Sequence, residues 1–154
     1  MNYEIVQLEE KTVVGQSIRT SNNDPNMTSL IGSLWQRFYS NGIYQAIDHK
    51  KNDKSIGLYT SYEGDSKDAY DVMVCCEVEK VTEVSSGIVS QTIPAGKYAK
   101  FILQGDVHKV VADFWTKLWS MDLDRAYSCD FEEYQSGSDM NQAKIHIYIS
   151  LKEE

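Results

Sequence analysis

Two segments of the sequence repeat one helical pattern of apolar residues, and this repetition constrains the fold more than any other feature. In residues 24–42 and 105–122 the apolar residues recur at the spacing of one face of an α-helix. At one constant offset the two patterns coincide, so that Trp35 matches Trp115. The matched positions are Met27, Leu30, Ile31, Leu34, Trp35 and Phe38 in the first segment, and Val107, Val110, Val111, Phe114, Trp115 and Leu118 in the second. The pattern predicts helices near 26–40 and 106–120 in a tandemly duplicated chain.

The segments around each helix extend the repeat to β-strands. After the helices, Tyr59 aligns with Phe131, and residues 71–78 align with residues 144–151. Each half therefore combines one helix with several strands, which is typical of helices packed on one antiparallel sheet. We predict an α+β fold of tandem strand-helix-strand-strand repeats with two main helices and pseudo-two-fold symmetry.

Alternation along the last strand of each half divides its side chains between two faces. One face is aliphatic, and we expect it to pack on the helices. Its residues are Val72, Val74, Cys76 and Val78 in the first half, and Ile145, Ile147, Ile149 and Leu151 in the second. The opposite face carries Met73 and Tyr148, and we expect it to form a groove or a solvated surface.

The length and composition are those of one globular unit. A chain of 154 residues with a hydrophobic fraction of 42% is long enough to bury a core. We expect a single domain over residues 1–154, built from repeats at about 1–80 and 81–154. The start MNYEIVQLEE lacks the features of a signal peptide, and no apolar run approaches the roughly 20 residues of a membrane span. We therefore expect a cytoplasmic protein whose three cysteines are reduced thiols.

The charge and the motifs exclude several classes of function. A net charge of −8 argues against a nucleic-acid partner, which needs a basic surface, and permits a cationic ligand. The three histidines lack metal-ligand spacing with cysteines, and no glycine-rich phosphate loop is present. No metal and no cofactor are expected.

The stretch DFEEY at 130–134 places acids beside aromatic residues in an expected strand. Period-two alternation puts Glu132 and Tyr134 on one face, and Phe131 and Glu133 on the other. The residues alone leave three interpretations open: a solvated strand edge, an acid/base pair, or the wall of a pocket for a cation. We expect Glu133 to be solvated. A carboxylate buried among aromatic rings is costly unless it is paired, so an empty pocket tends to raise its pKa.

Five segments in this order and spacing resemble the effector-binding domain of multidrug-sensing regulators of the AraC and MerR types and of GyrI-like proteins. They are KTVVGQSIRTSN (11–22), IGSLWQRF (31–38), LYTSYEGD (58–65), TIPAGKYAKFILQG (92–105) and FEEY (131–134). The resemblance covers roughly residues 3 to 151. It implies two tandem repeats with a pocket where they meet. No helix-turn-helix segment is expected, because the effector domain uses the whole chain.

The resemblance also implies which residues bind the ligand. In the family's F-E-x-Y motif the glutamate pairs with a lipophilic cation, and Glu132 matches it. A tyrosine on the last strand is an aromatic partner in such pockets, and Tyr148 is the matching candidate. Tyrosine and tryptophan rings hold cations through their faces. The candidate ligand-binding residues are Glu132, Tyr148, Tyr134, Tyr59, Tyr62, Trp115 and Met73.

The leading hypothesis is a stand-alone binding protein for hydrophobic organic cations or drug-like molecules, linked to transcription regulation or drug response. One alternative is an enzyme: some GyrI-like proteins hydrolyse strained electrophiles with a pocket glutamate and an aromatic hydroxyl. Another is an interaction module acting on a topoisomerase or a regulator. A protein partner or a homodimer remains open.

Overall fold

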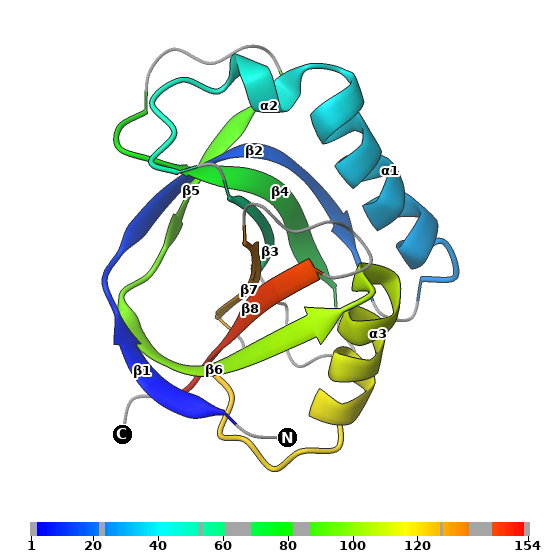
Figure 1. Cartoon of the computed structure of the whole chain (residues 1–154), viewed down its shortest axis with the longest axis vertical. Helices are drawn as coiled ribbons and strands as arrows, with labels where there is room; N and C mark the ends of the chain where they lie inside the picture. The colour runs from blue at the N-terminus through cyan, green and yellow to red at the C-terminus, as the bar shows by residue number, and fades with distance from the viewer. Residues whose placement is uncertain are drawn as a thin grey trace.

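The described residues form one eight-stranded antiparallel sheet and three helices (Figure 1). The computed structural model describes residues 3–21, 24–52, 54–60, 69–81, 87–126, 128–135 and 143–152. In chain order the elements are β1 (Glu4–Leu8), β2 (Lys11–Thr20), α1 (Met27–Ser40), α2 (Ile43–Ala46), β3 (Ser55–Thr60), β4 (Tyr70–Val78), β5 (Val89–Ile93), β6 (Gly96–Gly105), α3 (Val107–Leu118), β7 (Cys129–Tyr134) and β8 (Ala143–Ser150). The predicted α+β class and antiparallel sheet are confirmed.

The order of the strands shows the two-fold repeat directly. The sheet runs β1-β6-β8-β7-β3-β4-β2-β5. When β1 is matched with β5, β2 with β6, β3 with β7 and β4 with β8, this order is the same from either end. The pseudo-two-fold axis therefore lies at the join of β3 and β7, where the two halves of the chain meet.

The first strand of each half belongs to the sheet of the other half. β1 pairs with β6 and β5 pairs with β2, although β1 and β2 are consecutive in the chain. The two halves are therefore interlocked by exchanged strands at both ends of the sheet. Sequence periodicity did not predict this exchange, because it carries no information about which strands pair.

The two main helices lie outside the curled sheet on one side (Figure 1). The aliphatic faces of β4 and β8 pack under α1 and α3 respectively, as predicted, with Leu34 and Phe38 on α1 and Phe114 and Leu118 on α3. α1 begins at Met27, directly after a turn at Pro25 and Asn26, and the Asp24 carboxylate accepts a hydrogen bond from the Asn26 backbone amide at 2.8 Å. No described helix is long and apolar enough to cross a membrane.

The opposite face of the sheet is a third core, and the expectation of a groove or solvated surface there is wrong. Residues from all eight strands meet inside the curl of the sheet, among them Met73, Cys75, Phe131 and Tyr148. Met73 is 2% exposed and Tyr148 is 8% exposed. The physical reason is the curvature: a sheet that curls on itself buries its concave face, whereas a flat sheet would leave one face in water.

Candidate functional site

A buried carboxylate on β7 is the centre of the candidate site. Glu132 is 1% exposed. Its Oε2 accepts hydrogen bonds from the Tyr59 hydroxyl at 2.9 Å and from the Trp115 indole nitrogen at 2.7 Å. Its Oε1 accepts one from the Tyr134 hydroxyl at 2.7 Å. The three donors come from β3, α3 and β7, so the site exists only when both halves of the chain are folded together.

The donors around Glu132 are neutral. Within the part of the chain that the structure describes, no ion pair reaches this carboxylate. Burial raises the pKa of Glu132, and the hydrogen bonds from Tyr134, Trp115 and Tyr59 partly oppose that rise. Burial, together with the nearby Glu132 carboxylate, raises the pKa of Tyr59 and Tyr134 well above the ordinary value. These hydroxyls therefore stay protonated as donors, and among the described residues the acid has no counter-ion.

The pairing of the strands places Gly57 opposite Glu132 at the pseudo-two-fold axis. Gly57 pairs with Glu132 across the join of β3 and β7. Gly57 also pairs with Val74, and Glu132 pairs with Ile147. Because Val74 and Ile147 are matched in the repeat, Gly57 and Glu132 occupy equivalent positions. Tyr59 then matches Tyr134. The alignment of Tyr59 with Phe131 proposed from the sequence is wrong by three residues, so it matched side chains on opposite faces of the sheet.

Two tryptophans flank the carboxylate in a nearly symmetric arrangement. The Trp35 ring meets the Tyr134 ring edge-on, with centroids 5.0 Å apart at an angle of 78°. The Trp115 ring meets the Tyr59 ring at 5.2 Å and 66°. Each tryptophan thus contacts the tyrosine of the other half of the chain. All four rings are half-buried, so aromatic surface surrounds the acid on several sides and still reaches solvent.

The structure brings together four of the residues predicted from the sequence and separates two others from them. Glu132, Tyr134, Tyr59 and Trp115 are in direct contact. Tyr148 and Met73 are not, because they point into the core inside the sheet. Tyr148 stacks on Phe131 at 4.6 Å and 19°, on the face opposite Glu132. Tyr62 lies outside the described residues.

Two members of the site were missed by sequence reasoning. Trp35 is not among the candidate ligand-binding residues predicted from the sequence, although its match with Trp115 in the repeat is a signal for its role. Gly57 has no side chain, and only the strand register shows its importance. A Cβ atom at this position would lie 3.1 Å from Oε1 of Glu132 and 3.2 Å from the Trp35 ring.

The neighbouring acid Glu133 is not solvated, contrary to the expectation. It is 8% exposed on the inner face of the sheet, where its carboxylate lies 3.8 Å from Lys54 Nζ. The Gln135 side chain donates to the same carboxylate at 3.0 Å. The two-residue period of the strand correctly placed Glu133 on the face opposite Glu132, but the curvature of the sheet buries that face.

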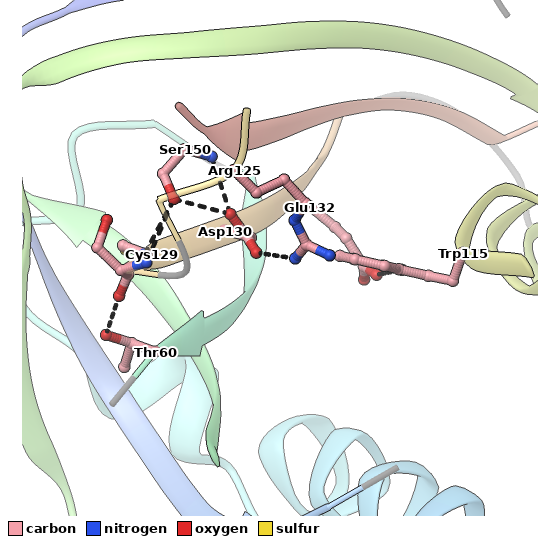
Figure 2. Close-up of polar contacts among 8 residues, drawn as sticks. Thr60, Trp115, Arg125, Cys129, Asp130, Glu132 and Ser150 are labelled. Carbon is pink, nitrogen blue, oxygen red and sulfur yellow. Dashed lines mark hydrogen bonds and ion pairs between the residues drawn. The ribbon is translucent and has the colours of Figure 1, made fainter. Parts of the chain in front are cut away.

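A second buried acid on β7 has a cationic partner (Figure 2). Asp130 is 0% exposed and lies 2.7 Å from the Arg125 guanidinium. It also accepts hydrogen bonds from the Ser150 amide at 2.8 Å and the Ser150 hydroxyl at 3.1 Å. This ion pair fastens the segment after α3 to the sheet. Asp130 therefore has a structural role, whereas no described cationic side chain pairs with Glu132, two residues further on.

Other chemistries have little support. Cys75, Cys76 and Cys129 are buried free thiols, and burial raises the pKa of Cys129 to about 12. A buried thiol with a raised pKa is a poor nucleophile. Among the described residues no group of three acidic, histidine or cysteine side chains could hold a metal ion.

A pseudo-symmetric sheet with two flanking helices, and an aromatic-lined acid where its halves meet, defines an effector-binding domain. The family comparison agrees with this class: residues 4–151 match the model described as "Cass2: Integron-associated effector binding protein". The chain belongs to this family. The resemblance to effector-binding domains predicted from the sequence is confirmed.

Three solved structures show how closely the fold is shared. The integron cassette protein VCH_CASS2 from the mobile metagenome of Vibrio cholerae has 33% identity and a TM-score of 0.80, over 97% of this chain and 95% of that one. SAV2435 bound to tetraphenylphosphonium has 23% identity and a TM-score of 0.80, over 99% and 94%. A putative transcription regulation protein from Staphylococcus aureus MU50 has 23% identity and a TM-score of 0.79, over 99% of both chains. None of the curated proteins compared matches the chain.

Proposed function

We propose that this protein binds a hydrophobic organic cation, with Glu132 as its counter-ion and the rings of Trp35, Tyr59, Trp115 and Tyr134 as its contact surface. The observation that carries the proposal is the burial of Glu132, whose hydrogen-bond donors in the described part of the chain are all neutral. A buried acid without a counter-ion costs free energy, and an arriving cation offsets that cost.

The aromatic rings supply the rest of the binding free energy. A cation over the face of a tyrosine or tryptophan contributes about 0.5–2 kcal/mol per ring, depending on desolvation. A lipophilic cation adds the burial of its own apolar surface. The solved complex of SAV2435 with tetraphenylphosphonium supports this ligand class, since that protein shares the fold.

The role in the cell is part of the same proposal. The similarity to a putative transcription regulation protein supports a link to regulation through ligand sensing. The protein partner, the homodimer and the cytoplasmic location expected from the sequence stay predictions. Tyr148 and Met73 are not included in the proposed site, because they lie on the other face of the sheet.

The test compares a cation with an uncharged molecule of similar shape. Tetraphenylphosphonium and triphenylphosphine oxide are added separately to the protein, and the melting temperature is measured. At a ligand concentration of about 100 times Kd, binding adds about 2.7 kcal/mol of stability, which raises the melting temperature by roughly 5–10 °C. The cation should give this rise and the neutral oxide should not. Equal shifts for both, or none for a panel of lipophilic cations, would contradict the proposal.

A further inference from the structure

A row of aromatic rings leads from the candidate site along α1 to the protein surface. Tyr134, which donates to Glu132, contacts Trp35. One helical turn further on, the Tyr39 ring lies nearly parallel to the Trp35 ring, with centroids 6.4 Å apart and an angle of 16°. Tyr39 is 49% exposed. The row therefore joins the buried acid to solvent by direct ring contacts.

The ring of Tyr39 is held in place at its polar end. Its hydroxyl shares a hydrogen bond with Ser55, which is 4% exposed. Ser55 pairs with Tyr134 across the join of β3 and β7, so this hydrogen bond anchors Tyr39 beside the site. The Tyr39 ring also contacts the Tyr44 ring, with centroids 5.5 Å apart and a tilt of 36°. An exposed ring with a fixed orientation loses little conformational entropy when a ligand stacks on it.

The second half of the chain has no such row in the described residues. Asp130 lies two residues before Glu132, as Ser55 lies two residues before Gly57, so the two positions are equivalent. The Arg125 guanidinium lies 2.7 Å from Asp130 (Figure 2). In the first half, the Tyr39 hydroxyl forms a hydrogen bond with Ser55 at the equivalent position. Trp119 follows Trp115 as Tyr39 follows Trp35, but it lies past the end of α3 and has no ring partner in the described part of the chain. Among the described residues, the row of aromatic rings from the site to solvent therefore runs along α1 and has no counterpart along α3.

We propose that Trp35 and Tyr39 form an outer subsite for a flat aromatic substituent of the bound cation. This inference rests on the proposed function. The ligand would be an organic cation whose charge lies near Glu132 and whose aromatic arm follows α1 toward solvent. A compact cation would contact only the rings beside Glu132, which are those of Tyr59, Trp115 and Tyr134, and would not reach Tyr39. Tyr39 is then a residue that determines specificity for arm-bearing ligands.

Two quaternary ammonium ions that differ by one phenyl ring test the subsite. Benzyltrimethylammonium has no arm, and (biphenyl-4-ylmethyl)trimethylammonium carries the second ring as an arm. We expect Tyr39→Leu to weaken binding of the biphenyl compound about 3- to 10-fold, the range for one aromatic contact. Binding of the benzyl compound should change by less than about two-fold, a difference near 0.4 kcal/mol.

Two further variants separate the ring from other effects. Tyr39→Phe keeps the ring and should bind both compounds nearly as the original protein does. Trp119→Leu removes the exposed ring just past the end of α3 and should also leave both affinities unchanged. Affinity that falls equally for both compounds in Tyr39→Leu, or for neither, overturns the subsite while the proposed function stands. Failure of the unmodified protein to bind either compound overturns the subsite, and the separate titration with tetraphenylphosphonium then decides whether the proposed function fails as well.

A measurement on the unmodified protein makes the test independent of any variant. Nuclear Overhauser contacts between the outer ring of the biphenyl compound and the Tyr39 ring are expected. Contacts of that outer ring with Trp119, and none with Tyr39, would overturn the assignment.

Discussion

Gly57 and Glu132 face each other across the join of β3 and β7, at equivalent positions of the two halves of the chain. The axis that relates the halves passes between them, so there is room for only one side chain. A Cβ atom on Gly57 would come within 3.1 Å of the Glu132 carboxylate. A second acid here would also place two like charges side by side in a buried site. The duplicated fold therefore provides symmetric rings around a single negative charge.

The first prediction tests the charge of Glu132. Glu132→Gln keeps the shape of the side chain and removes its charge. Removing one partner of a buried charge pair costs about 2–5 kcal/mol, so affinity for tetraphenylphosphonium should fall roughly 30-fold or more. The unliganded variant should unfold at the same or a higher urea concentration, because it no longer buries an acid without a counter-ion.

Glu133→Gln is the control for this variant, since Glu133 lies on the same strand with its side chain on the other face. Its affinity for the cation should stay within about 0.5 kcal/mol of the original. An unchanged affinity in Glu132→Gln, measured by calorimetric titration, would remove Glu132 from the site.

The second prediction concerns Gly57. Gly57→Ala places a methyl group in close contact with Glu132 and Trp35, and both must shift to make room. We expect a loss of stability of about 1–3 kcal/mol, as for other overpacked sites, and a fall in cation affinity. Gly32→Ala on α1 is the matched control, because nothing lies within 4 Å of its added Cβ. That control should stabilise the helix by about 0.5–1 kcal/mol. Equal unfolding free energies for the two variants would show that the site tolerates a side chain at position 57 beside Glu132 and Trp35.

The third prediction concerns the buried ion pair of Arg125 and Asp130. Arg125→Met removes the guanidinium that lies 2.7 Å from the buried Asp130 carboxylate. Breaking a buried pair in this way costs about 3–5 kcal/mol of unfolding free energy. Urea denaturation monitored by tryptophan fluorescence measures this loss. Lys152 and Asp124 form an exposed pair at 3.7 Å, and Lys152→Met should change stability by less than about 1 kcal/mol. Similar small losses for both variants would mean that Arg125 contributes no more than a surface pair.

The fourth prediction follows from the raised pKa of Glu132. In the unliganded protein the folded state holds the proton of Glu132 more tightly than the unfolded state does. The contribution of Glu132 to stability is therefore fully present below the ordinary pKa of 4.5 and is lost as pH rises through the raised pKa. Binding of a permanent cation has the opposite dependence, because it needs the ionised form.

The measurement is the affinity for tetraphenylphosphonium, which does not titrate, as a function of pH. Affinity should decline on acidification at a pH above 4.5, the ordinary value for a glutamate. The profile of Glu132→Gln should be flat over the same range. A parallel decline in both proteins would assign the pH dependence to another group.

The sequence alone determined the features that depend on local periodicity. The apolar stripes of α1 and α3 and their match of Trp35 with Trp115 follow from the 3.6-residue period of the helix. The shared face of Glu132 and Tyr134, and the aliphatic faces of β4 and β8, follow from the two-residue period of the strand. These periods are set by backbone geometry, so they can be read without knowing the partners of each element.

Only the tertiary structure decided which of these faces meet. The exchange of β1 and β5 between the halves, and the pairing of Gly57 with Glu132, depend on strand register between segments far apart in sequence. The curl of the sheet put Tyr148 and Met73 into a core, although alternation alone allowed an open groove. Long-range pairing also brought Tyr59 and Trp115 to one carboxylate. The local pattern fixes the face of a side chain, but its burial and partners come from the free energy of packing the whole sheet.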